Sequence, residues 1–269
     1  MYAVLPEFTV EPVPEGAVFT LQRPSRLNAL TQSLRRGLIQ AVDHLEAEGR
    51  SLLVITAAGD RAFCAGTDLT ELEALDTATR IARCDEARAQ MLRLSRSPVV
   101  TVAAINGLAY GGGLELAMAC TLRIAVPHAQ LSLPEVKLGL LPAYAGTQFL
   151  PTLVGPARAL ELMLTGRVVT AQEALAMGLI HRVAAPHAPV HEQALAFGRE
   201  VTRHAPSAIA AIRACVAAAG AQVTTEGLAV EAAQVQTQFA HPDAQEGMTA
   251  FLEKRMPQWC KDPASAGRE

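Results

Sequence analysis

Short apolar runs separated by helical segments constrain the fold of this 269-residue chain more than any other feature. The runs span residues 52–56, 99–105 and 122–126, and glycine or proline residues lie close beside them. Short runs that are mostly apolar, although they include Thr56, Thr101 and Arg123, are typical of strands that are buried on both faces. Because helical segments separate the runs, the sequence predicts an α/β fold in which helices cover a parallel sheet.

Local capping signals place the helices between and after these runs. Thr31 can N-cap a helix whose apolar face consists of Leu34, Leu38, Val42 and Leu45. From about residue 155 the pattern is helical, and we expect helices at 156–165, 171–177, 206–219, 225–240 and 243–254. We therefore expect a core over residues 1–200 and a helical part over 201–269, with a boundary near residues 198–206.

Composition excludes several function classes. The net charge is −3, Lys and Arg are scattered, and aromatic residues make up 4%, so we expect no nucleic-acid partner. No uninterrupted stretch of about 18 apolar residues occurs, so we expect no membrane span. The five cysteines are odd in number and form no CxxC pair, which favours a reducing, cytoplasmic location over a zinc or disulfide framework. Half of the residues are hydrophobic, which favours buried subunit faces.

A glycine-rich segment, residues 106–115, is the first candidate for chemistry. It follows the run at 99–105, precedes a helical segment, and contains Gly111, Gly112 and Gly113 in succession. Glycines at a strand-to-helix turn leave backbone N–H groups open to an anion or a developing oxyanion. A tight turn that needs left-handed glycines is an equally good interpretation of the segment taken alone.

A second loop and two carboxylates complete the candidates. Residues 60–69 form a loop of mostly small residues after the run at 52–56. A ligand could approach the backbone of this loop closely, or the loop could simply connect two elements of secondary structure. Glu115 lies in the first turn of an apolar helix, and Glu135 follows Pro134. Apolar surroundings raise a carboxyl pKa, and two such groups facing one water can divide acid and base roles. Each glutamate could instead be structural, Glu115 at the helix N-terminus and Glu135 paired with a basic residue.

Other catalytic arrangements are not favoured. No Gly-x-Ser-x-Gly elbow occurs, and no histidine lies near Cys64 in sequence. His187 and His191 have helical metal-ligand spacing, but Pro189 lies between them, so we expect no metal site there.

These segments, taken in order, resemble the crotonase family of enoyl-CoA hydratases and isomerases. The resemblance covers nearly the whole chain with the family's usual spacing. The matching stretches are RPSRLNAL at 23–30, RAFCAGTDL at 61–69, NGLAYGGGLELAM at 106–118, PE at 134–135, GTQ at 146–148, LTG at 164–166, AQEA at 171–174, GL at 178–179 and EGMTAFLEKR at 246–255.

The resemblance implies a crotonase-like spiral of ββα units, with 201–269 as a helical oligomerisation part of a homo-trimer or a hexamer built as a dimer of trimers. It implies an acyl-CoA thioester whose oxygen lies between the backbone N–H groups of Thr67 and Gly112. Hydratases of the family use two glutamates, which fall on Glu115 and Glu135, and isomerases commonly keep one. It thus implies hydration of a 2-enoyl-CoA to a 3-hydroxyacyl-CoA. By family analogy Glu135 protonates C2 and Glu115 activates the water.

Two alternatives remain open from the sequence. One is isomerisation or other enolate chemistry on an acyl-CoA, and the other is a non-catalytic acyl-CoA-binding subunit. The resemblance implies no metal and no separate cofactor, because coenzyme A is part of the substrate. It also implies a set of CoA- and substrate-binding residues. They are Arg26, Leu27, Ala29, Arg61, Ala65, Gly66, Asp68, Leu69, Gly111, Pro134, Ala143 and Tyr144.

The segment at 141–149 departs from the family pattern. Relatives commonly carry glycine at the positions of Ala143 and Ala145, and arginine at that of Phe149. Alanine keeps a backbone N–H but restricts φ, and Tyr144 adds bulk near the expected acyl pocket. A basic residue common in relatives is replaced by Thr70, which predicts weaker phosphate contacts.

Overall fold

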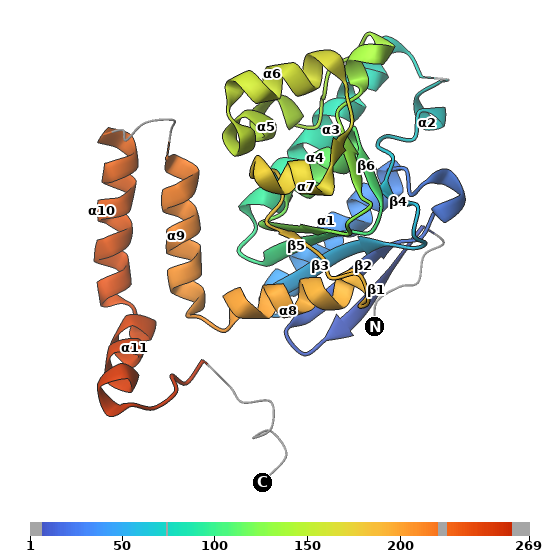
Figure 1. Ribbon diagram of the computed structural model, residues 1–269. Helices are drawn as coiled ribbons and strands as arrows, with labels where there is room; N and C mark the ends of the chain where they lie inside the picture. Colours follow the sequence, from blue (N-terminus) through green and yellow to red (C-terminus); the bar gives the residue numbers. More distant parts are fainter. Residues whose placement is uncertain (1–6, 74, 220–224, 260–269) are drawn as a thin grey trace. The chain divides into compact units, whose positions relative to one another are not determined.

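The computed structural model describes residues 7–73, 75–219 and 225–259. The chain divides into two compact units, Met1–Gly198 and Arg199–Glu269. The first unit is a mixed α/β structure and the second is helical (Figure 1).

The larger sheet of the first unit has six strands in the order β1-β2-β3-β5-β7-β10. β1 and β2 form an antiparallel hairpin, and every other neighbouring pair is parallel. β3 and β5 are buried at every position, as the apolar runs predicted. The strands are β1 (Phe8–Val13), β2 (Gly16–Leu21), β3 (Leu52–Ala57), β5 (Val100–Ile105), β7 (Leu122–Ala125) and β10 (Arg182–Val183).

A smaller sheet has four strands in the order β4-β6-β8-β9, with β9 antiparallel to its neighbour. Its first three strands each follow directly on a strand of the larger sheet, so the pairs β3–β4, β5–β6 and β7–β8 repeat along the chain. A helix follows each pair, which is the predicted succession of ββα units. The strands are β4 (Ala62–Cys64), β6 (Leu108–Tyr110), β8 (Gln130–Ser132) and β9 (Val169–Thr170).

The helices of the first unit follow their local signals closely. Thr31 caps α1, since its side-chain oxygen accepts a hydrogen bond from the Leu34 N–H, and the four predicted apolar positions are buried. Thr170 caps α7 through the Glu173 N–H. The helices are α1 (Gln32–Ala47), α2 (Thr70–Glu73), α3 (Thr77–Arg96), α4 (Gly112–Ala119), α5 (Gly146–Val154), α6 (Pro156–Thr165) and α7 (Ala171–Ala176), with 3₁₀ turns η1 (Pro24–Arg26) and η2 (Glu135–Leu138). α8 (Val190–Thr202) begins in the first unit, and its last turn belongs to the second.

α4 is buried over its whole length. A Cβ on Gly113 would lie 2.2 Å from the carbonyl oxygen of Cys64, so only glycine lets α4 pack against β4 at this point. The glycine-rich segment is therefore needed for packing as well as for a turn.

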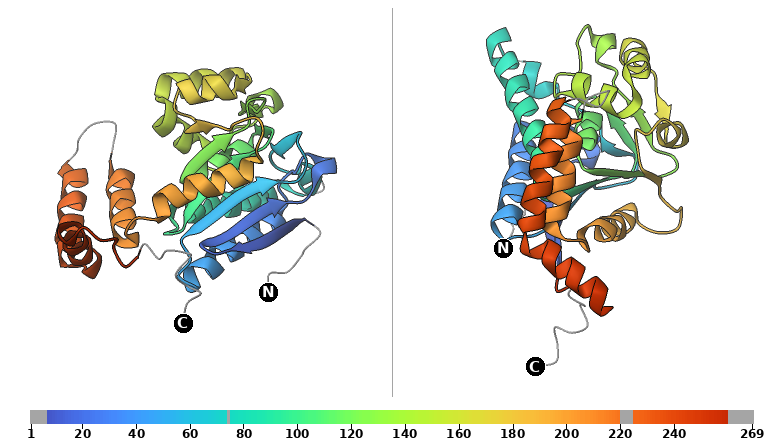
Figure 2. Two further views of the ribbon diagram at one scale, coloured as in Figure 1. Left: turned by 60° about the horizontal axis from the view of Figure 1, so that its bottom comes forward. Right: turned by 90° about the vertical axis from the view of Figure 1, so that its left-hand side faces the viewer.

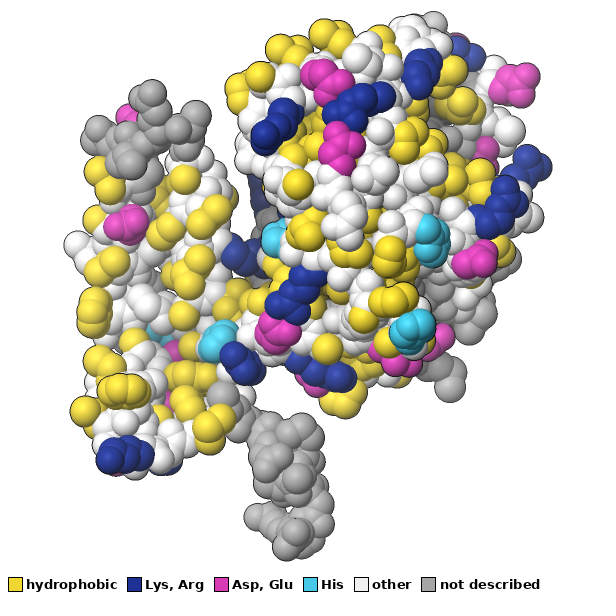
Figure 3. Space-filling view, in the orientation of Figure 1, with side chains coloured by type: hydrophobic (Ala, Val, Ile, Leu, Met, Phe, Trp, Pro, Cys, Tyr) yellow, Lys and Arg dark blue, Asp and Glu magenta, His cyan; other side chains and the backbone are white. Residues whose placement is uncertain are grey.

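The second unit consists of α9 (Pro206–Ala218), α10 (Thr225–Ala240) and α11 (Pro242–Glu253), and α9 and α10 pack side by side (Figure 2). The predicted start of the last helix at Asp243 is wrong by one residue: Pro242 begins it and His241 caps it, accepting from the Asp243 N–H. Many apolar side chains of this unit are exposed (Figure 3). They include Ile212, Val216, Leu228, Val235, Phe239, Met248, Phe251, Leu252 and Met256. Among the described helices, none is long and apolar enough to cross a membrane.

Candidate active site

One cavity of the first unit collects most of the predicted site residues. Its volume is about 150 Å³, and both glycine-containing loops, the start of α4 and the segment around η2 contribute to its lining. The predicted residues that line it are Ala65, Gly66, Thr67, Leu69, Gly111, Gly112, Glu115, Pro134, Glu135, Ala143 and Tyr144. Residues that are up to 79 positions apart in sequence therefore meet in one place.

Glu115 is held firmly at this cavity. It lies in the first turn of α4 and is 2% exposed. Its Oε1 accepts hydrogen bonds from two backbone N–H groups, those of Tyr144 at 2.8 Å and Gly146 at 2.7 Å. A Cβ on Gly146 would lie 2.7 Å from the same oxygen, so the segment before α5 can approach the carboxyl group only with glycine there.

Glu135 reaches the cavity from the opposite loop and is held less. It begins the 3₁₀ turn η2 after Pro134, and its Oε2 is buried without a hydrogen-bond partner among the described residues. Its Oε1 faces the glycine-rich loop, because a Cβ on Gly111 would lie 3.0 Å from it. Gly111 has φ of +51°, a left-handed conformation that favours glycine. An unpartnered buried carboxyl oxygen is costly, and such atoms concentrate at functional sites.

The environment changes the proton affinity of both carboxyl groups in the predicted direction. Burial, together with the nearby charge of Glu135, raises the pKa of Glu115 to about 8, although the Gly146 and Tyr144 N–H groups oppose the change. Burial also raises the pKa of Glu135. Two interacting carboxyl groups titrate as a pair, so this pair retains a proton near neutral pH.

The two predicted N–H donors lie where the loops meet. A Cβ on Gly66 would lie 2.9 Å from the carbonyl oxygen of Tyr110 and 3.3 Å from the Gly112 nitrogen, so the loops are in close contact. Leu30 and Thr67 form an isolated parallel bridge that holds the 60–69 loop against residue 30. Within the described residues, neither the Thr67 N–H nor the Gly112 N–H donates a hydrogen bond. Both donors are therefore open to a ligand.

Tyr144 contributes a hydroxyl group beside these donors. Its oxygen accepts a hydrogen bond from Thr67 Oγ1 at 2.8 Å, and its side chain is buried. Behind it, Arg35 Nη1 lies 3.4 Å from the same hydroxyl oxygen. Arg35 is 2% exposed and was not recognised from the sequence.

Some of the predicted ligand residues lie outside the cavity. Arg26 and Arg61 are exposed, and Leu27 and Ala29 run beside the 60–69 loop, with the Ala65 N–H donating to the Leu27 carbonyl. Their contacts with coenzyme A stay predictions. Asp68 forms an ion pair with Arg23 at 2.8 Å and accepts a hydrogen bond from the Thr70 hydroxyl at 2.6 Å, and its contact with the ligand also stays a prediction.

Four lining residues were not recognised from the sequence: Cys84 of α3, Leu138 of η2, and Leu140 and Leu141 of the following loop. The three leucines are 57–64% exposed. A dense apolar cluster directly after a candidate catalytic glutamate is the signal that could have identified them.

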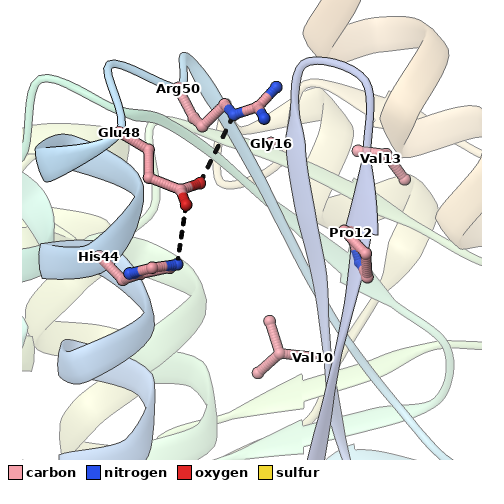
Figure 4. Close-up of a pocket in the computed structure, with 7 residues that line it drawn as sticks. All are labelled: Val10, Pro12, Val13, Gly16, His44, Glu48 and Arg50. Carbon is pink, nitrogen blue, oxygen red and sulfur yellow. Dashed lines mark ion pairs between the residues drawn. The ribbon is translucent and has the colours of Figure 1, made fainter. Parts of the chain in front are cut away.

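A second cavity, of about 430 Å³, lies between the β1–β2 hairpin and the end of α1 (Figure 4). Its ionisable side chains contact one another: Glu48 lies 3.2 Å from His44 and 3.6 Å from Arg50. It contains none of the predicted site residues. Its larger volume therefore does not make it the site of chemistry. No cluster of three or more potential metal ligands occurs among the described residues.

Known proteins match this chain over most of its length. Residues 16–262 match the model of the family described as enoyl-CoA hydratase/isomerase. A probable enoyl-CoA hydratase of Bacillus subtilis is 37% identical over 244 residues, which cover 90% of this chain and 94% of that protein. A crotonyl-CoA hydratase of Syntrophomonas wolfei is 37% identical over 245 residues, covering 89% and 92%.

Solved structures also match this chain over nearly its whole length. A crystal structure of enoyl-CoA hydratase from Bacillus anthracis superposes with a TM-score of 0.87 at 33% identity, covering 95% of this chain and all of that chain. A structure of Pseudomonas aeruginosa DspI gives a TM-score of 0.89 at 35% identity, covering 96% and 98%.

Proposed function

Since the chain belongs to the enoyl-CoA hydratase/isomerase family, we propose that it hydrates a 2-enoyl-CoA to a 3-hydroxyacyl-CoA. The observation that carries this proposal is the pair of buried carboxyl groups, Glu115 and Glu135, lining one cavity beside two open backbone N–H groups. An acid and a base on one water are what hydration of a conjugated double bond requires.

The thioester oxygen accepts hydrogen bonds from the Thr67 and Gly112 N–H groups. When water attacks C3, electron density moves from the C2–C3 bond onto this oxygen and forms an enolate. Preorganised donors stabilise that charge, and losing one such donor typically costs about 10²–10³ in rate. Because the donors are backbone groups at the junction of two loops, glycine at residues 66, 111 and 112 keeps the approach open.

The two glutamates divide the proton transfers. The Glu115 carboxylate takes a proton from the water as its oxygen bonds to C3, and Glu135 donates a proton to C2 of the enolate. The net change is the addition of one water, and the proton gained by Glu115 balances that lost by Glu135. Because burial raises the pKa of both carboxyl groups, the pair shares one proton near neutral pH. Hydration proceeds from the form in which this proton is on Glu135, whose Oε2 has no hydrogen-bond partner among the described residues, and in which the Glu115 carboxylate accepts its two N–H bonds.

The remaining parts of the proposal concern binding and assembly. Arg26 and Arg61 are exposed and available to the phosphates of coenzyme A, which the substrate itself carries. The apolar side chains exposed on α9, α10 and α11 support a role in forming a homo-trimer or hexamer. Light scattering tests this assembly: a monomer at micromolar concentration would contradict it. A cytoplasmic location stays a prediction.

The activity test is the loss of crotonyl-CoA absorbance with purified protein. Turnover that yields the 3-hydroxyacyl product is expected, and no turnover with enoyl chains of any length would contradict hydration. Supplying a 3-enoyl-CoA in parallel separates hydration from isomerisation, because an isomerase would convert it to the 2-enoyl-CoA without adding water.

A further inference from the structure

Tyr144 contacts Glu115, the glycine-rich loop and Thr67, and the mechanism above uses only its backbone N–H. Its N–H donates to Glu115 Oε1 at 2.8 Å. Its ring lies against the glycine-rich loop, because a Cβ on Gly112 would lie 3.0 Å from Tyr144 Cε2. Its hydroxyl oxygen accepts from Thr67 Oγ1 at 2.8 Å. Tyr144 therefore contacts both residues that supply the proposed oxyanion donors, and its backbone holds the proposed base.

The ring is fixed from behind by a buried cation. The Arg35 guanidinium lies 5.3 Å from the Tyr144 ring centroid and 3.4 Å from its hydroxyl oxygen, and Arg35 Nε donates to Gln90 Oε1 at 3.2 Å. No ion pair joins Arg35 to a carboxylate within the described parts of the chain. A buried cation is costly unless other groups compensate it, and here the ring face, the hydroxyl and Gln90 do so, together with the nearby charge of Glu86. Moving the ring away would remove part of this compensation, so the ring forms a fixed wall of the cavity.

The space in front of this wall is small. The cavity volume is about 150 Å³, and Cys84 and Ala143 line it together with Tyr144. Sites for drug-sized ligands span about 300–1,000 Å³, and an engineered protein cavity of about 150 Å³ holds a single benzene. This cavity therefore has room for roughly six carbon atoms.

We infer that Tyr144, anchored by Thr67 and Arg35, is a specificity-determining residue that restricts the site to thioesters with short acyl chains. The inference rests on the proposed acyl-CoA function and deepens it by naming the substrate class. The bulk of the ring sets the limit, and the two polar contacts keep the ring in place.

Binding of saturated acyl-CoA thioesters tests the inference without requiring turnover. Butyryl-CoA and decanoyl-CoA are titrated by calorimetry into the wild type, Tyr144→Phe, Tyr144→Leu and Tyr144→Ala. We expect the wild type to bind butyryl-CoA at least about 10-fold more tightly than decanoyl-CoA. Tyr144→Ala should shift this ratio by about 10-fold or more toward decanoyl-CoA, and Tyr144→Leu should shift it less. Tyr144→Phe keeps the ring volume and the Arg35 contact with the ring face but loses both hydroxyl contacts, so it should shift the ratio in the same direction by less than Tyr144→Leu.

The outcomes separate this inference from the proposed function. Equal chain-length ratios in the wild type and in the Leu and Ala variants would overturn the role of Tyr144, whether or not the enzyme hydrates crotonyl-CoA. Absence of binding to both thioesters in the folded wild type would overturn the proposed function and this inference together. Binding with the expected shift, but without hydration of any enoyl-CoA, would support the specificity role and refute hydration. Because Tyr144→Leu leaves a smaller void than Tyr144→Ala, it keeps the test valid if the Ala variant does not fold.

Discussion

The two carboxyl groups of the site are held in different ways. Glu115 projects from the buried helix α4, and two backbone N–H groups fix one of its oxygens. Glu135 begins a short 3₁₀ turn, and one of its oxygens has no partner among the described residues. This contrast indicates that one side of the cavity is preorganised to carry charge, while the other keeps an oxygen available for a proton.

We expect the largest effect on kcat from replacing either of the two glutamates, because each replacement removes one of the two proton transfers. Glu135→Gln and Glu115→Gln should each lower kcat for crotonyl-CoA hydration by about 10²–10⁴. In Glu115→Gln the new amide oxygen can still accept both N–H bonds, so the loss should reflect proton transfer and not displacement of the side chain. Steady-state kinetics measure the effect, and calorimetric binding of butyryl-CoA is the control. If either variant kept full activity, the proposed division of roles would be wrong.

The close contact between Gly146 and the Glu115 carboxyl group predicts the second-largest effect on kcat. In Gly146→Ala the new Cβ would lie 2.7 Å from Glu115 Oε1, so the carboxyl group must shift. A displacement of about 1 Å can cost about 10²-fold in rate. We expect kcat to fall by about that factor while circular dichroism shows an intact fold. Gly49→Ala is a comparison outside the site: its Cβ meets nothing within 4 Å, but its φ of +63° strains alanine, so it should lower stability without lowering kcat. An active Gly146→Ala enzyme would show that Glu115 is less constrained than its contacts indicate.

The raised pKa of Glu115 predicts a stability that depends on pH. Its folded pKa of about 8 lies above its ordinary value of 4.5, so the folded state holds the proton more tightly. Stability is then fully present below pH 4.5 and is lost as pH rises through 8. We expect the wild type to lose at least about 2 kcal/mol more than Glu115→Gln between pH 5 and 9. Urea unfolding at several pH values measures this, and parallel curves for the two proteins would contradict the assignment.

Much of the fold was predictable because its signals are local. Apolar runs marked β3 and β5, and Thr31 and Thr170 marked helix starts, since caps and periodicity act within a few residues. The start at Asp243 was wrong because His241 competes as the cap through its ring nitrogen. Such competition between neighbouring cap residues is decided by geometry that spacing does not specify.

The site was predictable only where the family resemblance supplied it. Glu115 and Glu135 are each ambiguous alone, and their placement in one cavity depends on pairing β6 with β8. The contact of Arg35 with Tyr144 joins residues 109 positions apart, and Arg35 lies on a helix that otherwise has the pattern of an ordinary surface helix. Contacts of this kind follow from packing of the whole unit and leave no local pattern.

The smallest effect concerns strain on the Glu115 side. Ala145 lies between the two residues whose N–H groups hold Glu115, and its φ of +79° is left-handed. A left-handed conformation costs an L-residue about 1–2 kcal/mol, whereas glycine adds about 0.4–1 kcal/mol of unfolded-state entropy. Ala145→Gly should therefore stabilise the protein by roughly 0.5–1 kcal/mol. Ala143→Gly is the matched control: Ala143 has no left-handed φ, so glycine there should destabilise by a similar amount. Denaturant unfolding measures the change in the free energy of unfolding for both variants. If the two changes were equal, the left-handed conformation of Ala145 would store no strain, and the loop would hold Glu115 at no cost in backbone conformation.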